Sequence, residues 1–252
     1  MALSVLVMGF GYAAKTFHVP FLQAMDAYSI NGVVSSDPAK VQGVLPGVSV
    51  YDSFEQAVAD DNFDLVVITT PNHLHAEQAE AALRAGCHVL VEKPFTLSSE
   101  RAEQLVAVAA QLNKQLCVFH NRRFDGDFLT LKQLIAEQAV GDIKRLESRF
   151  DRFRPTPRKR WRENAGPGSG IFWDLGPHLI DQVVQLFGMP QQVSADIRIL
   201  REGGESDDAF EVTLHYAAIT VKVGSSPFEA GPTLRYALQG TKGSYRKYHL
   251  DP

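Results

Sequence analysis

The first half of the chain alternates between short apolar runs and stretches whose apolar residues recur at helical spacing. Continuous apolar runs are typical of parallel strands that are buried on both faces, whereas helical spacing indicates one buried face. The runs predict strands at Ser4–Met8, Ile30–Val34, Asp64–Ile68, His88–Val91 and Leu116–Phe119. The intervening stretches predict a helix that ends near Ala27 and is opened or kinked by Pro20, and helices at Phe54–Asp60, Leu74–Ala85 and Ser98–Leu112. This alternation with short loops predicts right-handed crossovers and a parallel sheet.

After about His120 the strand-like segments follow one another with few helices between them. Helices are expected at Phe124–Glu137 and Pro177–Phe187, and strands at Ile143–Phe153, Val193–Leu200, Ala209–Tyr216, Thr220–Ser225 and Leu234–Gln239. Consecutive strands joined by turns indicate a mainly antiparallel sheet. We therefore predict an α/β protein with a parallel-sheet domain at residues 1–120. An α+β domain with an open, mostly antiparallel sheet is expected at residues 121–252.

Composition excludes several classes of protein. The 252 residues carry 25 basic and 29 acidic side chains, a formal net charge of −4, which argues against a general nucleic-acid binder. Cys87 and Cys117 have apolar neighbours, which predicts buried, reduced thiols. The N-terminus predicts a strand instead of a signal peptide, and no apolar run reaches the roughly 18 residues of a membrane helix. We expect a cytoplasmic protein that binds neither nucleic acid nor membrane.

A glycine-rich turn follows the first predicted strand. The segment Gly9–Ala14 reads Gly-Phe-Gly-Tyr-Ala-Ala, the spacing G-x-G-x-x-A. In such a turn the first glycine allows the tight bend, and the second lets the backbone approach a pyrophosphate at the start of the helix. The spacing alone also fits an ordinary strand–helix turn. Its place between a first strand and a helix favours dinucleotide binding.

The residues after the second predicted strand bear on which dinucleotide binds. A carboxylate there bonds the ribose 2′-hydroxyl of NAD and repels the 2′-phosphate of NADP. If the strand ends at Val34, Ser35 and Ser36 occupy this position. Their hydroxyl groups, with Lys40 nearby in the sequence, can bind a phosphate. This interpretation favours NADP. In the alternative, Asp37 reaches the ribose and NAD binds.

Two polar segments follow the third and fourth predicted strands, where a parallel sheet binds its ligands. In Thr70-Pro71-Asn72-His73-Leu74-His75, Asn72 either contacts a cofactor or merely caps the next helix. His73 and His75 point to different faces of a helix and have no evident third partner, so we expect no metal. In Glu92-Lys93-Pro94, the lysine either polarises a substrate oxygen or forms a surface ion pair.

Two segments in the second half contain further candidates. In Asp174-Leu175-Gly176-Pro177-His178, we expect Pro177 at the first position of a helix, with Asp174 and His178 facing one pocket. The alternative is a helix cap and a core histidine. The basic loop at residues 152–162 either forms a solvated face, clamps a phosphate or borders a substrate, with Trp161 and Arg162 as candidate contacts.

Taken together, these motifs and Asn121-Arg122-Arg123-Phe124 resemble the Gfo/Idh/MocA family, which includes glucose–fructose oxidoreductase and inositol dehydrogenase. The resemblance spans essentially the whole chain and implies an N-terminal Rossmann domain. It also implies a C-terminal open sheet that commonly forms a dimer interface, so a homodimer or higher homo-oligomer is expected. It implies that Lys93 contacts substrate and nicotinamide, and that Asp174 and His178 orient substrate and transfer the proton.

The residues expected to bind the cofactor are Gly9, Phe10, Gly11, Tyr12, Ala13, Ser35, Ser36, Lys40, Thr70, Pro71, Asn72, His75, Glu92, Lys93 and Asn121. Those expected to bind substrate are Lys93, Arg122, Trp161, Arg162, Asp174 and His178.

The chain departs from the family pattern at two places. Ser35 stands where many NAD-preferring members have an acid, which supports NADP. Family members also usually extend further, so we expect the second domain to be incomplete. The resulting hypothesis is an NAD(P)-dependent oxidoreductase acting on a secondary alcohol or ketone of a sugar, inositol or related polyol. The alternatives are a non-catalytic dinucleotide sensor and a dihydrodiol-type dehydrogenase.

Overall fold

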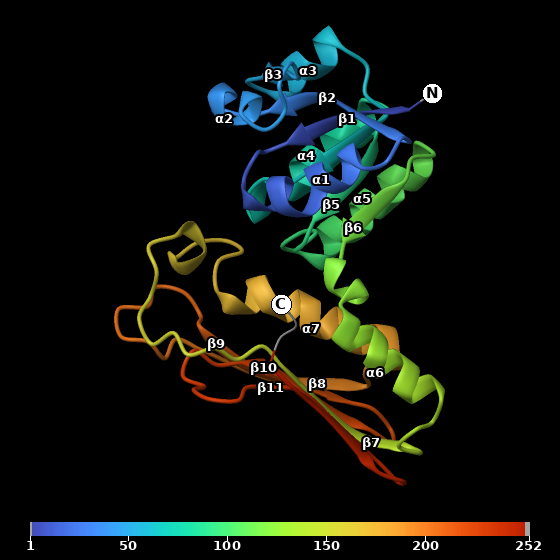
Figure 1. The fold of residues 1–252 in the computed structure, drawn as a ribbon, viewed down its shortest axis with the longest axis vertical. Helices are drawn as coiled ribbons and strands as arrows, with labels where there is room; N and C mark the ends of the chain where they lie inside the picture. Colours follow the sequence, from blue (N-terminus) through green and yellow to red (C-terminus); the bar gives the residue numbers. More distant parts are fainter. Residues whose placement is uncertain (1, 250–252) are drawn as a thin grey trace. The chain divides into compact units, whose positions relative to one another are not determined.

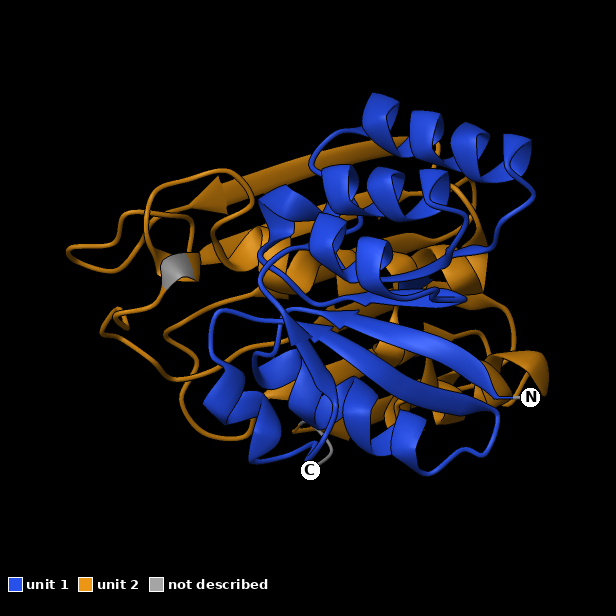
Figure 2. Cartoon of the chain, turned by 90° about the horizontal axis from the view of Figure 1, so that it is seen from above, with its two compact units in different colours: residues 1–119 blue, residues 120–252 orange. Residues whose placement is uncertain are grey.

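The computed structural model describes residues 2–249, and the chain divides into two compact units, residues 1–119 and residues 120–252 (Figure 2). Each unit contains one six-stranded sheet. Within the described part of the chain, no helix is both long enough and apolar enough to cross a membrane.

Unit 1 is built on a parallel sheet with the strand order β3-β2-β1-β4-β5-β6 (Figure 1). The strands are β1 (Leu3–Met8), β2 (Tyr28–Val34), β3 (Ser49–Tyr51), β4 (Leu65–Ile68), β5 (His88–Glu92) and β6 (Leu116–Phe119). The helical segments are η1 (Ala14–His18), α1 (Val19–Gln23), α2 (Pro38–Gln42), α3 (Phe54–Asp60), η2 (Asn72–Leu74), α4 (His75–Arg84) and α5 (Ser99–Gln111). The predicted parallel α/β architecture of this half is confirmed. Cys87 is buried as predicted, whereas Cys117 is exposed.

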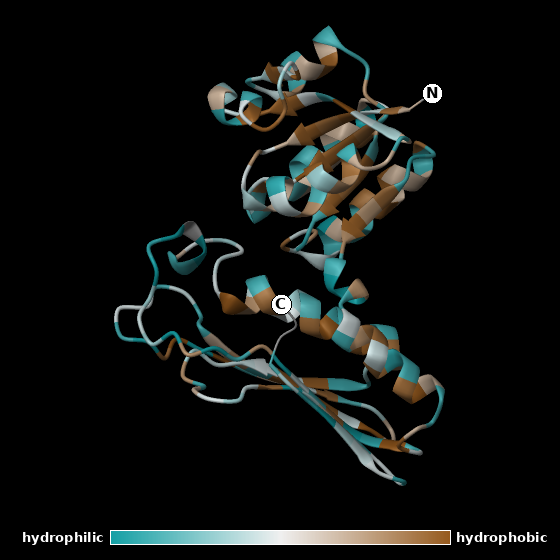
Figure 3. Ribbon diagram, in the orientation of Figure 1, coloured by the Kyte–Doolittle hydropathy of each residue, from teal (hydrophilic) through white to brown (hydrophobic). Residues whose placement is uncertain are grey.

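The central strand β1 is buried on both faces of this sheet. Leu6 and Met8 pack into one apolar cluster, whereas Val5 and Val7 pack into another on the opposite face. Figure 3 shows the strands of this unit as mainly hydrophobic. Since the faces are filled by side chains, polar chemistry is confined to the loops at the strand ends.

Three details of unit 1 differ from the prediction. The first helix ends at Gln23, before Ala27, because the Ala27 carbonyl accepts the Leu3 N–H at 2.8 Å and so belongs to the start of the sheet. The sequence pattern also missed α2 and the edge strand β3. These have five and three residues, too few to show a periodic pattern.

Unit 2 has a mixed sheet with the strand order β12-β11-β7-β10-β9-β8, in which only the β7–β10 pair is parallel. The strands are β7 (Ile143–Arg149), β8 (Gln192–Arg198), β9 (Ala209–His215), β10 (Thr220–Ser225), β11 (Leu234–Gly240) and β12 (Ser244–Tyr248). The helical segments are η3 (Asn121–Phe124), α6 (Gly126–Ala136), η4 (Trp161–Glu163) and α7 (Ile171–Phe187). Helices α6 and α7 lie along one face of the sheet, and the core lies between them and the strands (Figure 1). The mostly antiparallel sheet was predicted, whereas β12 was missed.

Strand β7 ends at Arg149, four residues before the predicted end at Phe153. Beyond it, the N–H groups of Phe150 and Arg152 still donate to backbone carbonyls, but side chains also take part in the pairing. The Ser225 hydroxyl donates to the Phe150 carbonyl at 2.7 Å, and the Ser226 N–H donates to Asp151 Oδ1 at 2.8 Å. The segment after β7 therefore stays extended beside β10 without being a regular strand.

Helix α7 begins at Ile171, so the predicted start at Pro177 is wrong. Pro177 lies inside the helix, and the cap is formed from elsewhere in the chain. The Ile171 N–H donates to the Asp207 carbonyl at 2.8 Å, and the Phe172 N–H donates to Asp207 Oδ2 at 2.6 Å. A distant residue thus allows α7 to begin six residues before the local signals indicate.

Candidate active site

The glycine turn after β1 has the geometry that a close ligand approach requires. Gly9 has φ +85°, and a Cβ there would lie 3.2 Å from the Thr69 backbone and from the Thr70 side chain. Thr69 Oγ1 lies 3.0 Å from the Gly9 carbonyl, to which it can donate. A Cβ on Gly11 would meet nothing within 4 Å. The turn is therefore held against the end of β4 at Gly9 and open at Gly11.

The other residues of this turn differ in exposure. Phe10 is buried in the apolar core, so only its backbone can contact a ligand, whereas Tyr12 is exposed. Ala13 is half-buried, and Ala14 is buried where the helical segment packs on the sheet. The small side chain of Ala14 fits the close helix–strand packing of this kind of turn.

The loops after β4 and β5 are joined by a buried histidine. His75 is fully buried, and its ring nitrogens lie 2.8 Å from the carbonyl oxygens of Thr70 and Pro94. We therefore revise its predicted role: His75 positions the two loops from inside instead of presenting a ring nitrogen to a cofactor. Asn72 is also buried, and neither η2 nor α4 has a side-chain cap hydrogen bond.

Glu92 and Lys93, at the end of β5, differ in their surroundings: Glu92 contacts a histidine, and Lys93 is half-buried. His18 Nε2 lies 2.9 Å from Glu92 Oε1, and both side chains are largely buried. The His18 ring also packs against Phe119, with the ring centroids 4.4 Å apart. Lys93 is half-buried, directly after this pair, and precedes the cis peptide bond to Pro94. Glu92 thus braces the first helical segment against the strand end that carries Lys93.

The residues after β2 bear on the two interpretations of the ribose position. Strand β2 ends at Val34, and Asp37 caps the short helix α2, where its Oδ1 accepts the Lys40 N–H at 3.0 Å. The Asp37 N–H donates to Ser35 Oγ at 3.2 Å. Ser36 and Lys40 are exposed. The serines therefore directly follow the strand, and the Asp37 carboxylate is engaged by the helix.

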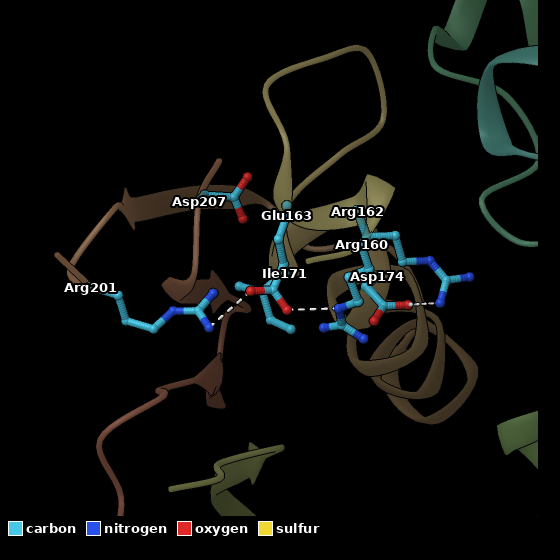
Figure 4. A pocket seen from close by; sticks show the side chains of 8 residues that line it. Arg160, Arg162, Glu163, Ile171, Asp174, Arg201 and Asp207 are labelled. Atoms are coloured by element: carbon cyan, nitrogen blue, oxygen red, sulfur yellow. Dashed lines mark hydrogen bonds and ion pairs between the residues drawn. The ribbon is translucent and has the colours of Figure 1, made fainter. Parts of the chain in front are cut away.

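In unit 2, helix α7 presents Asp174 and His178 one turn apart. His178 is 6% exposed, and Asp174 is half-buried. Asp174 Oδ1 lies 3.8 Å from Arg162 Nη1, an ion pair that joins η4 to α7 (Figure 4). Of the two substrate candidates in the basic loop, Arg162 thus lies beside Asp174, whereas the side chain of Trp161 lies outside the described residues.

The segment Asn121–Phe124 forms η3 and is tied to the same helix. Gln182 Nε2, one turn beyond His178, donates to the Arg122 carbonyl at 2.7 Å. The Arg122 guanidinium pairs with Asp125 at 2.9 Å and lies over the Phe150 ring. The backbone of Arg122 is therefore held by α7, and Asn121 directly precedes this anchored position.

Two residues that support the site were missed from the sequence. His18 and Glu92 are 74 positions apart, and Asp207 is 35 positions from Phe172. Neither pair forms a local motif, so only the tertiary structure shows them. In the described residues, no group of three or more His, Cys, Asp or Glu side chains could hold a metal ion.

Comparison with known proteins identifies both halves of the chain. Residues 3–120 match the oxidoreductase family with an NAD-binding Rossmann fold, and residues 128–246 match a GFO/IDH/MocA C-terminal domain. The chain is 47% identical over 246 residues to the uncharacterised oxidoreductase YdgJ of Escherichia coli, covering 98% of this chain and 71% of YdgJ.

Two further similarities extend over the same length. Over 251 residues the chain is 39% identical to the scyllo-inositol 2-dehydrogenase (NADP+) IolW of Bacillus subtilis, covering 99% of this chain and 70% of IolW. The solved structure of YPO2259 from Yersinia pestis superimposes with a TM-score of 0.93 at 44% identity, covering 100% of this chain and 71% of that one. The chain therefore belongs to the Gfo/Idh/MocA family of oxidoreductases, whose N-terminal domain is an NAD-binding Rossmann fold.

Proposed function

We propose that this protein is an NADP-dependent dehydrogenase that interconverts a secondary alcohol and the ketone of an inositol or related polyol. The observation that carries the proposal is the buried His178, one helical turn from Asp174 on α7. Two supports are the family membership and the similarity to a relative named as a scyllo-inositol 2-dehydrogenase.

The loops of unit 1 fit a dinucleotide. A Cβ would be crowded at Gly9 and unobstructed at Gly11, the combination expected where a turn is held tightly and its outer side accepts a pyrophosphate. We propose that this turn, the Thr70–Asn72 loop, Ser35, Ser36, Lys40 and the backbone near Glu92 hold the cofactor. When bound, the nicotinamide supplies the site that accepts or donates hydride.

The chemistry left to the protein is proton transfer and orientation. We propose that the His178 imidazole takes the proton from the substrate hydroxyl in oxidation and returns it in reduction, a role suited to histidine near neutral pH. Asp174 orients the substrate or the imidazole, and the Lys93 ammonium polarises the reacting oxygen. Burial limits the access of water to His178, which strengthens such interactions.

We test the role of His178 by steady-state oxidation of inositol isomers with NADP. We expect His178→Ala to lower kcat by about 10²–10⁴-fold, the range for removal of a general acid–base group. His215→Ala is the matched control, because His215 lies on β9 outside the proposed site and should retain activity. If His178→Ala retained kcat, with NADP affinity unchanged, the proposed mechanism would be wrong.

The preference for NADP has its own test at Ser35. We expect Ser35→Asp to weaken NADP binding by about tenfold, or about 1.4 kcal/mol, because a carboxylate repels the 2′-phosphate. NAD binding should stay equal or improve. Calorimetric titration of both cofactors measures this difference, with Ser29→Asp on the exposed start of β2 as the control. Wild-type protein that binds NAD more tightly than NADP would contradict the proposal.

A further inference from the structure

The basic loop between β7 and α7 concentrates positive charge. Residues 152–162 contain six Arg and Lys side chains in a chain whose net charge is −4. Two neighbouring carboxylates are occupied by cations. Glu163 pairs with Arg160 at 2.7 Å and with Arg201 at 3.1 Å, and Asp151 pairs with Arg149. In the described residues, no carboxylate lies within ion-pair distance of the remaining guanidinium groups of Arg152, Arg154 and Arg158.

The backbone fixes the direction in which Arg152 points. The N–H groups of Phe150, Arg152 and Arg154 donate in turn to the carbonyls of residues 224, 226 and 227, at 2.9, 3.0 and 2.7 Å. In extended chain, alternate residues share a face. Phe150 is buried in the core that α7 covers, so Arg152 lies on the side of α7.

Electrostatics place the same side chain beside the proposed catalytic helix. Burial lowers the pKa of Arg152, the charge of Asp174 raises it, and the charges of Arg122, Arg160 and Arg158 lower it further. Three further guanidinium groups, those of Arg122, Arg158 and Arg160, therefore act on Arg152 against the single opposite charge of Asp174. Crowded, partly buried cations are unfavourable unless an anion lies between them.

A hollow lies next to this cluster. Its lining residues are Arg160, Arg162, Glu163, Gly170, Ile171, Asp174, Arg201 and Asp207. Figure 4 shows Arg160 and Arg201 drawn toward Glu163, and Arg162 toward Asp174. Arg160 and Arg201 are thus paired with Glu163, whereas Arg152, Arg154 and Arg158 lie outside the lining of the hollow. The hollow borders Asp174, so a ligand held here lies next to the proposed catalytic helix.

We propose that the substrate carries an oxyanion, as a carboxylate or a phosphate ester on the polyol, and that Arg152 binds it with Arg154 and Arg158 nearby. This inference rests on the proposed polyol dehydrogenase function and narrows its substrate class. Guanidinium groups bind both oxyanions through paired hydrogen bonds, so the residues fit either source.

The test compares glucuronate, glucose 6-phosphate and glucose by calorimetric titration of the full chain saturated with NADP. At least one of the two acids should bind about tenfold or more tightly than glucose, and its affinity should fall as salt is raised. Stronger binding of glucuronate assigns a carboxylate, and stronger binding of glucose 6-phosphate assigns a phosphate.

Variants then assign the effect to the loop. Arg152→Gln should lower the affinity for the acid by at least about tenfold while the NADP affinity stays unchanged. Arg152→Lys should retain only part of the wild-type affinity for the acid. Arg198→Gln, an ion-paired arginine on β8, is the matched control. Because Arg158 is exposed, Arg158→Gln provides a second variant that leaves the packing intact.

The two proposals fail separately. If inositols are oxidised with NADP but both acids bind no more tightly than glucose, the oxyanion site is wrong and the dehydrogenase stands. If acids bind in an Arg152-dependent manner but no polyol or acid is turned over, the dehydrogenase is wrong and the site stands. Acid affinity that is equal in wild type and Arg152→Gln overturns the inference.

Discussion

Gly170 joins the basic loop to the helix that carries Asp174 and His178. It has φ +93° and ψ 164°, a conformation that is open almost only to glycine. A Cβ there would lie 1.9 Å from Asp207 Oδ1, the oxygen beside the one that caps α7. The absence of a side chain at Gly170 therefore lets the distant carboxylate reach the start of the helix.

Gly170→Ala should lower the free energy of unfolding more than Gly188→Ala. Gly188, at the other end of α7, has a similar backbone conformation, but a Cβ there meets nothing within 4 Å. Both changes carry a backbone cost of about 1–3 kcal/mol, and Gly170→Ala adds the loss of the cap, about 1 kcal/mol. Urea unfolding followed by circular dichroism measures both variants. Equal losses would show that the cap contributes nothing.

Residues next to a helix end set that end in two helices of unit 1. Ser98 caps α5 by accepting the Arg101 N–H, and Gly86 follows α4 with φ +85°. Both residues lie within a few positions of the helix that they begin or end, so a short sequence window contains them. Asp207 and His18 act on partners far along the chain, which no short window reveals.

The loop around η4 is held by one carboxylate. Burial raises the pKa of Glu163, but hydrogen bonds from the Arg158 N–H and the Arg160 side chain outweigh it and leave the pKa below the ordinary 4.5. The ionised form is thus preferred in the folded protein. Glu163 therefore stabilises the fold above pH 4.5, and this contribution is lost as the pH falls below that value.

We expect Glu163→Gln to destabilise the protein at neutral pH by an amount that shrinks as the pH falls below about 4.5. The neutral amide cannot pair with Arg160 and Arg201 as a carboxylate does. Unfolding midpoints across the pH range measure the difference from wild type, with the exposed Glu103→Gln on α5 as a control. A difference that does not change with pH would exclude the charge as its source.

At the level of elements, segments with a clear apolar run or helical repeat were predictable, whereas α2, β3 and β12 were not. Helix α3 has the predicted bounds, as does strand β10. The missed edge strands β3 and β12 form only by pairing with the strand beside them, because an isolated strand of three to five residues is not stable. Beyond β7, the chain likewise contacts Ser225 and Ser226, which are far from it in the sequence.

On the scale of the whole molecule, the second sheet leaves an edge uncovered. All seven residues of β8 are exposed, including Val193 at 59% and Ile197 at 45%. These two side chains lie on the same face of the strand. Exposed apolar residues along an edge strand favour association with another chain. We therefore propose that the protein is a homo-oligomer through this sheet.

Light scattering should give at least twice the mass of one chain, 27.8 kDa. The double change Val193→Asp and Ile197→Asp should shift the mass to that of a monomer, since charges on this face oppose burial. Gln192→Asp with Ser194→Asp places the same charge on the opposite face and should leave the assembly intact. A monomeric wild type at the same concentration would contradict the proposal.

The cap from Asp207 also determines when helix α7 can be completed during synthesis of the chain. The residue that completes the start of α7 lies beyond β8, so the first turn of the helix cannot be capped until that later stretch has been synthesised and has returned. For protein engineering, the connection between β8 and β9 is consequently a poor place for a tag or an insertion. Lengthening it would loosen the start of the helix that carries Asp174, although the two are remote in sequence.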